Sequence, residues 1–158
     1  MLSRDPDSQV RLPTIDDIRF YQAAIGEKYP LCADVWGAAD GLKLLIQSTE
    51  DESKQNKNYN GWTHGHYINS CFVFPPDDKI RVCLINAPGT FHDSTMADYG
   101  FYDAMKAVYD TAGGKVVVDL AFKVSAKDYL VRSSQEDPQD DRGLLLNRQA
   151  TSIRQLSE

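Results

Sequence analysis

The chain has 158 residues, of which 42% are hydrophobic and 25% are charged, and its net charge is −6. This length and composition are typical of one globular domain and exclude a disordered chain. The acidic balance also argues against a surface that holds nucleic acid mainly through Lys and Arg, although a nuclease site built from metal-binding carboxylates is itself acidic.

No apolar run approaches the roughly 18 residues that a membrane-spanning helix needs. The first residues lack the apolar core of a signal peptide. The three cysteines, Cys32, Cys71 and Cys83, form no C-x-x-C pair, so we expect reduced thiols. These features predict an intracellular protein that is neither secreted nor in a membrane.

The N-terminal part, residues 1–33, is predicted to be a polar tail followed by a docking helix. Thr14 and Asp17 have the spacing of a capping box, and apolar residues follow at helical spacing. Gly26 and Pro30 mark the predicted end of this helix.

Residues 35–46 are predicted to form the first strand, with Asp40 inside it. Small residues, among them Gly37 and Gly41, flank Asp40, so a ligand or a neighbouring backbone could approach its carboxylate. Asp-Gly is also a common hairpin turn, but the apolar residues 44–46 favour a strand that continues past Gly41.

The middle of the chain predicts a hairpin and then a helix. The charged segment 48–58 is predicted to be a solvated loop, and residues 67–74 and 80–85 to be paired strands. A helix is then predicted to open near residue 93, with Asp93 or Ser94 as its N-cap and its apolar residues facing the sheet.

A valine run ending in Asp119 is the strongest strand signal. Residues 115–118 follow the turn pair Gly113-Gly114 and are typical of a central strand buried on both faces. Open α/β sheets bind ligands at the carboxyl ends of their strands, which is where Asp119 lies. The alternative is that Asp119 caps the next element through its own backbone.

The last part of the chain predicts a short strand at residues 129–131, a hydrophilic loop at 133–143 and a terminal helix. Leu146, Ala150 and Ile153 lie at helical spacing, and Arg154 shares one side of this helix with Glu158.

Hairpin-linked strands followed by strands joined through helices predict an α/β fold, a mixed sheet with flanking helices. This order resembles the ribonuclease H-like fold. Two divalent cations that clamp a phosphodiester need oxygen ligands from two or three carboxylates on rigid elements. Asp40, Asp119 and Glu158 can supply them if all three meet at one edge of the sheet.

Several blocks of sequence resemble a known family, and they span residues 34–158. They are Trp36–Lys43, Tyr59–His64, Asn86–Ser94, Val116–Asp119 and the closing Ala150–Glu158. In this order they resemble a DDE-superfamily endonuclease domain, with the Harbinger-like (PIF-type) transposases as the nearest group.

The resemblance implies that Asp40, Asp119 and Glu158 are the catalytic, metal-binding residues and that Mg²⁺ or Mn²⁺ is the cofactor. It implies DNA as the partner, cleaved by activated water and joined through a DNA 3′-hydroxyl, and a location in the nucleus. His92 and Asp93 belong to a recurrent block of the family, and we interpret them as structural residues or as support for the ligands.

The chain also departs from the family pattern. Leu120 follows Asp119 where the family often has a small polar residue, and the family helix continues beyond the position of Glu158. The chain therefore resembles a catalytic core truncated at both ends. A protein partner would then supply the DNA-binding module that complete transposases carry.

Two other functions stay open. A catalytically inactive relic or host-retained domain could serve as an interaction module, which the acidic charge favours. His64 and His66 could instead belong to a zinc hydrolase, since an extended strand would put both on one side. The aromatic segment Tyr59–Trp62 could stack on bases or pack against its own sheet.

Overall fold

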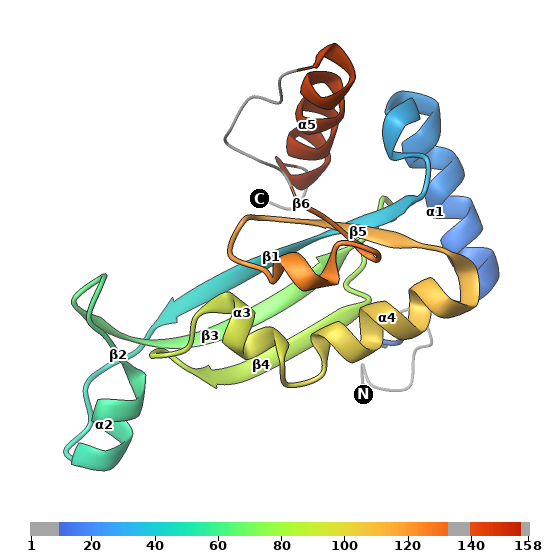
Figure 1. Ribbon diagram of the computed structural model, residues 1–158. Coiled ribbons are helices and arrows are strands. Elements are labelled where there is room, and N and C mark those ends of the chain that lie inside the picture. Colours follow the sequence, from blue (N-terminus) through green and yellow to red (C-terminus); the bar gives the residue numbers. More distant parts are fainter. Residues whose placement is uncertain (1–9, 133–139, 156–158) are drawn as a thin grey trace.

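The computed structural model describes residues 10–132 and 140–155, which form a six-stranded sheet with helices on both faces (Figure 1). The strands are β1 (Val35–Leu45), β2 (Tyr59–Asn60), β3 (Gly65–Phe74), β4 (Val82–Pro88), β5 (Lys115–Val118) and β6 (Leu130–Arg132). The helices are α1 (Ile15–Lys28), α2 (Glu52–Asn58), α3 (Asp93–Ala97), α4 (Phe101–Ala112) and α5 (Asp141–Arg154), with short 3₁₀ helices η3 (Pro30–Cys32) and η4 (Val124–Ala126).

The main strands lie in the order β4-β3-β1-β5-β6. β1, β3 and β4 pair antiparallel, whereas β5 and β6 run parallel to β1, and β2 pairs only with the start of β3. Three antiparallel strands followed by two parallel ones is the arrangement of a ribonuclease H-like fold. The predicted mixed α/β class is therefore confirmed.

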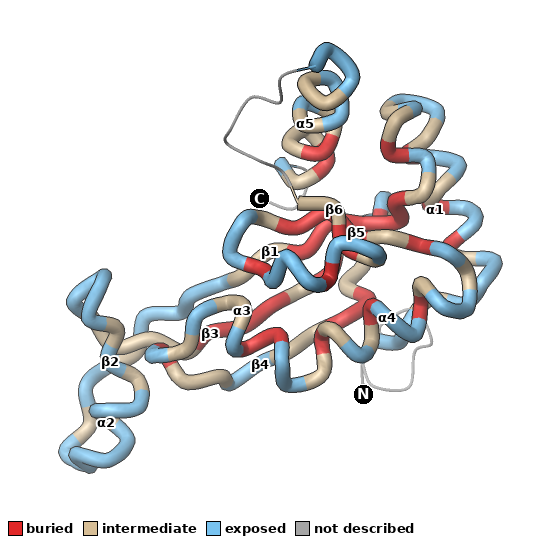
Figure 2. Tube along the Cα trace, viewed as in Figure 1, coloured by how far each residue is buried: buried red, intermediate tan, exposed pale blue. Residues whose placement is uncertain are grey.

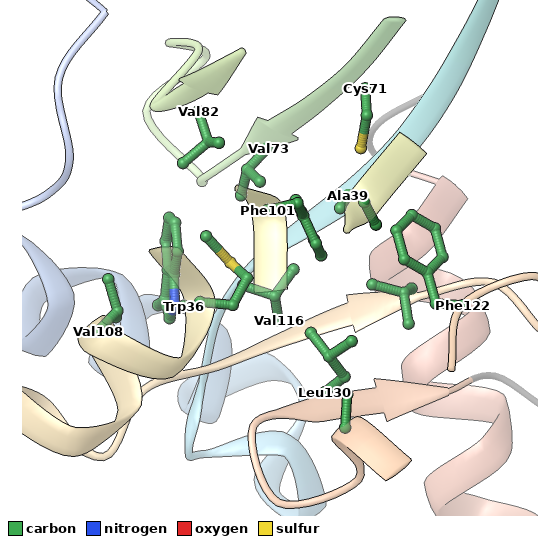
Figure 3. Packing of buried hydrophobic residues seen from close by; sticks show 14 of the residues in the cluster. Trp36, Ala39, Cys71, Val73, Val82, Phe101, Val108, Val116, Phe122 and Leu130 are labelled. Atoms are coloured by element: carbon green, nitrogen blue, oxygen red, sulfur yellow. The ribbon is translucent and has the colours of Figure 1, made fainter. Parts of the chain in front are cut away.

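The larger core lies between the sheet and the α3–α4 layer (Figure 3). Trp36 and Val116, from the neighbouring strands β1 and β5, pack there against Phe101 of α4. Gly114 must be a glycine, because a Cβ atom at that position would lie 2.7 Å from Cδ1 of Trp36. The turn before β5 thus brings the backbone directly against the core tryptophan.

The opposite face of the sheet is covered by α5. Ala150 and Ile153 are buried there with Ala38 and Val117, while the first half of α5 is largely exposed (Figure 2). Leu146 lies at helical spacing with Ala150 and Ile153 but is 37% exposed, so it does not share their burial. The C-terminal half of α5 alone fixes the helix to the sheet.

α1 is fastened to the sheet by a hydrogen-bonded network. The capping box of Thr14 and Asp17 is present at its start. Tyr21 Oη donates to Asp77 Oδ2 at 2.7 Å, and Arg81 Nη2 donates to Tyr21 Oη at 2.7 Å and to Asp77 Oδ2 at 2.8 Å. Burial, together with the bond to Asp77, raises the pKa of Tyr21 to about 12. The network joins α1 to the segment between β3 and β4.

Several element boundaries differ from the sequence expectations. The supposed loop at 48–58 contains α2, whose start is capped by Asp51. The expected helix at residue 93 is two helices, separated where Gly100 has φ +118°. Asp93 is the first residue of α3 rather than its cap, and α1 continues past Gly26 to Lys28.

Candidate active site

Asp40 and Asp119 lie at matching positions on the two central strands. β1 and β5 run parallel with Ala38 opposite Val117, and each Asp comes two residues later in its chain. Adjacent strands are about 4.8 Å apart, so the two residues are neighbours at one end of the sheet. Since side chains alternate along a strand, Asp40 shares the face of Ala38, which is the face that α5 covers.

Each of the two carboxylates also makes a local hydrogen bond. Oδ1 of Asp119 accepts from the backbone N–H of Ala121 at 2.8 Å, which is the capping role considered as the alternative. Oδ1 of Asp40 accepts from the N–H of Gly41 at 2.9 Å. In Asp119 the Oδ1 bond holds the side chain just beyond the end of β5, which leaves the second carboxylate oxygen, Oδ2, as a potential ligand.

Asp93 approaches β1 from the opposite face, that of α3. A Cβ atom on Gly41 would lie 3.1 Å from Oδ1 of Asp93, so the carboxylate rests on the glycine backbone beside Asp40. Asn69 of β3 is buried and donates from Nδ2 to the carbonyl of Phe91 at 2.8 Å, which fixes the segment that leads into α3. Because Gly41 has no side chain, there is room for a third carboxylate here. From the sequence alone, Asp93 is interpreted only as a structural residue or as support for the ligands.

The three carboxylates influence one another electrostatically. Burial raises the pKa of Asp93, and the negative charges of Asp119 and Asp40 raise it further against the opposing charge of Lys43. Burial also raises the pKa of the Cys71 thiol to about 12, with contributions from the same three carboxylates. Negative charge is therefore concentrated at this end of β1 and β5, as a site for a cation requires.

The donor set at this end suits a hard divalent cation. Carboxylate oxygens are the ligands of Mg²⁺, which keeps several waters and uses one or two protein carboxylates per ion. Within residues 10–132 and 140–155, however, no group of three or more His, Cys, Asp or Glu is arranged to hold a metal ion. Asp40 and Asp119 alone would provide the protein ligands from this part of the chain.

The third expected ligand, Glu158, lies outside the described residues. The helix that precedes it is on the correct side of the sheet, because α5 packs on β1 and β5 through Ala150 and Ile153. His92, the residue before α3, is exposed and makes no side-chain capping hydrogen bond.

The two candidate zinc ligands are not arranged as a pair on a strand. His64 lies in the turn before β3 with φ +52°, so the expectation of two imidazoles on one side of an extended strand is wrong. The ring of His66 contacts the ring of Tyr59 with centroids 5.4 Å apart. Nothing in this arrangement converges on a cation.

Asp40 and Asp119 are half-buried, and they lie outside the hollow next to β4. This hollow of about 390 Å³ lies between β4 and the α3 region, lined by residues such as Leu84, Phe91 and Met96, and neither Asp40 nor Asp119 lines it. None of the described helices is long and apolar enough to cross a membrane.

Comparison with known families agrees with this geometry. A family model described as a DDE superfamily endonuclease matches residues 39–158, about three-quarters of the chain. Comparison with curated proteins and with solved structures gives no match. The matched range begins one residue before Asp40 and contains all three carboxylates of this acidic edge, Asp40, Asp93 and Asp119. The chain therefore belongs to the DDE-superfamily endonucleases.

Proposed function

We propose that the chain is the catalytic core of a Harbinger-like transposase, a metal-dependent nuclease that cleaves and transfers DNA strands. The observation that carries the proposal is the matched position of Asp40 and Asp119 on parallel central strands, in a member of an endonuclease family. Both strands are fixed in the core on their two faces, so the carboxylates are held rigidly relative to each other.

In this proposal Asp40 and Asp119 hold Mg²⁺ or Mn²⁺, and Glu158 completes the ligand set. The ion supplies, when bound, a Lewis acid for the reacting phosphodiester. The protein contributes position: the bond from Ala121 N–H orients Asp119, and α5 packs through Ala150 and Ile153 on the face that carries Asp40. Such positioning matters, because a misplacement of about 1 Å can reduce a rate on the order of a hundredfold.

The test is strand cleavage of supercoiled plasmid DNA in Mn²⁺ or Mg²⁺. We expect Asp40→Asn, Asp119→Asn and Glu158→Gln each to reduce the nicking rate at least about a hundredfold. Asp110→Asn is the matched control, since Asp110 is an exposed acid on α4 that pairs only with Lys106. Equal rates in Asp119→Asn and the control would overturn the proposal.

The second candidate function is an inactive, host-retained domain that binds a partner. The absence, within the described residues, of a group of three residues arranged to hold a metal ion favours it. It predicts no nicking by any variant while the folded protein still binds its partner. A nuclear location, and a protein partner that carries a DNA-binding module, belong to the transposase proposal.

A further inference from the structure

One large aromatic side chain projects into the solvent instead of packing against the fold. Trp62 is 92% exposed, whereas the only other tryptophan, Trp36, is fully buried. Exposing a whole indole has a cost, because tryptophan is among the side chains with most apolar area to bury. The expectation that this aromatic turn packs against its own sheet does not hold for Trp62.

The turn that carries Trp62 is nevertheless rigidly built. Oδ1 of Asn60 accepts from the backbone N–H groups of Trp62 at 3.0 Å and Thr63 at 3.2 Å, while Nδ2 of Asn60 donates to the carbonyl of Gly89 at 2.9 Å. A Cβ atom on Gly89 would lie 2.4 Å from the carbonyl oxygen of Tyr67, so this glycine lets the strands approach closely. The backbone that carries the indole is thus fixed by hydrogen bonds, which reduces the entropy cost of binding.

The surroundings of this turn differ in charge from the rest of the chain. No Asp or Glu occurs between Glu52 and Asp77, although the chain as a whole has a net charge of −6. The same stretch contains Lys54, Lys57, His64 and His66. Within this stretch no carboxylate would repel a polyanion, although Lys54 pairs with Asp51, just outside it.

The turn lies in the direction in which β1 continues past Asp40. β1 continues past Asp40 toward its carboxyl end, and β3 and β2 extend that direction beyond the helical layers (Figure 1). Asp40 pairs with Phe72, and Gly65, next to the turn, lies seven residues earlier on β3. At about 3.4 Å per residue the turn is roughly 20 to 25 Å from Asp40, a distance of about six or seven base pairs.

We propose that Trp62 is a base-stacking contact for an unpaired base of the DNA substrate. The inference rests on the proposed nuclease function and assigns part of its substrate recognition. An exposed aromatic ring on a hydrogen-bonded turn, in a stretch of sequence without Asp or Glu, is the form of site on which bases of a single strand stack. An unpaired base suits it, because a base inside a duplex has both faces covered by its neighbours.

The test is binding of a labelled single-stranded oligonucleotide of about 16 nucleotides to the full chain in EDTA, where metal plays no part. We expect Trp62→Ala to weaken binding about fivefold to a hundredfold, and Trp62→Phe to retain most of the affinity. The matched control is Phe20→Ala, which removes an aromatic ring that is 66% exposed on α1, beside Asp16 and Asp17. A relaxed, covalently closed circular duplex, which has neither ends nor loops of unpaired bases, should bind the wild type and Trp62→Ala equally.

Fluorescence gives a second readout, because the two tryptophans differ so strongly in exposure. DNA should quench the emission of the wild type but leave that of Trp62→Phe, which reports Trp36 alone, unchanged. Equal affinity of Trp62→Ala and wild type for the single strand would overturn the inference. So would a change of oligomeric state in Trp62→Ala without loss of DNA affinity, since Trp62 would then contact a second copy of the chain.

The two proposals fail in different ways. Trp62→Ala should keep the Mn²⁺-induced shift in Tm of the wild type, because the turn is far from the acidic edge. If Trp62→Ala weakens binding but Asp119→Asn keeps the full response to Mn²⁺, the stacking site stands and the metal site falls. If Trp62→Ala keeps its affinity for the single strand while Asp119→Asn loses the response to Mn²⁺, the stacking site falls and the metal site stands.

Discussion

Replacing Tyr21 with phenylalanine removes one hydroxyl group from the network that fastens α1 to the sheet. That hydroxyl donates to Asp77 and accepts from Arg81, and Arg81 is only 6% exposed. Removing one partner so that a buried polar group is left unsatisfied costs about 1–3 kcal/mol, and Arg81 keeps its bond to Asp77. We therefore expect Tyr21→Phe to lower the free energy of unfolding by about 2 kcal/mol.

For a chain of this size, 1 kcal/mol corresponds to about 2–4 °C in Tm, so Tm should fall by about 4–8 °C. The assay is thermal and urea unfolding followed by circular dichroism, with Tyr99→Phe as control because Tyr99 is 69% exposed. A loss within about 0.5 kcal/mol of the control would refute the reasoning, since that is the range of ordinary surface substitutions.

The same network predicts a pH dependence. Burial acts to raise the pKa of Asp77, but hydrogen bonds from Tyr21 and Arg81 outweigh it and hold the pKa below its usual 3.8. The stability that Asp77 contributes is thus present above pH 3.8 and is lost as the pH falls through the folded pKa. Above pH 10 the unfolded state ionises at Tyr21 while the folded state keeps its proton up to about pH 12, which again lowers stability. The difference in free energy of unfolding between wild type and Tyr21→Phe should therefore become smaller at both low and high pH.

Three further predictions concern the site and the core. Asp93→Asn should raise the free energy of unfolding of the metal-free protein or leave it unchanged, because burial and the charges of Asp119 and Asp40 oppose ionisation of Asp93; a marked loss in urea unfolding at pH 7 would contradict this. Gly114→Ala should cost about 1–3 kcal/mol because its Cβ would lie 2.7 Å from Cδ1 of Trp36, whereas Gly61→Ala, with no atom within 4 Å, should be neutral in the same unfolding assay. Replacing both His64 and His66 with Gln should leave the Mn²⁺-induced shift in Tm intact, and stoichiometric zinc that is lost in this double variant would instead support the zinc alternative.

Much of the sheet could be predicted from local sequence patterns. The valine run of β5 and the long apolar pattern of β1 are strong signals, and the structure places both strands at the centre. The helix α2 was missed because its residues are polar on every side and none is buried, so no hydrophobic periodicity marks it. The break between α3 and α4 depends on Gly100 in a left-handed conformation. The apolar pattern continues across this break, so the sequence predicts a single helix.

The candidate site, too, could be predicted from the sequence only in part. Asp40 and Asp119 could be identified because each lies in or directly after a strong strand pattern. The place of Asp93 above Gly41 depends on how α3 packs against β3, which is a long-range contact without a local signal. Similarly, the exposure of Trp62 follows from the bonds of Asn60 to its own turn and to Gly89, which is distant in sequence.

The central claim is that Asp40 and Asp119 together bind a divalent cation, and a Mn²⁺ titration of Tm tests it most directly. At a concentration 100 times Kd, a ligand that binds only the folded state adds about 2.7 kcal/mol, or roughly 5–11 °C for this chain. We predict this shift for the wild type and for Asp110→Asn, and a much smaller shift for Asp40→Asn and Asp119→Asn. Both variants can keep the local bonds to Gly41 and Ala121 through their amide oxygens, so their folds should persist. Equal Mn²⁺ shifts in all four proteins would contradict the assignment of the metal site.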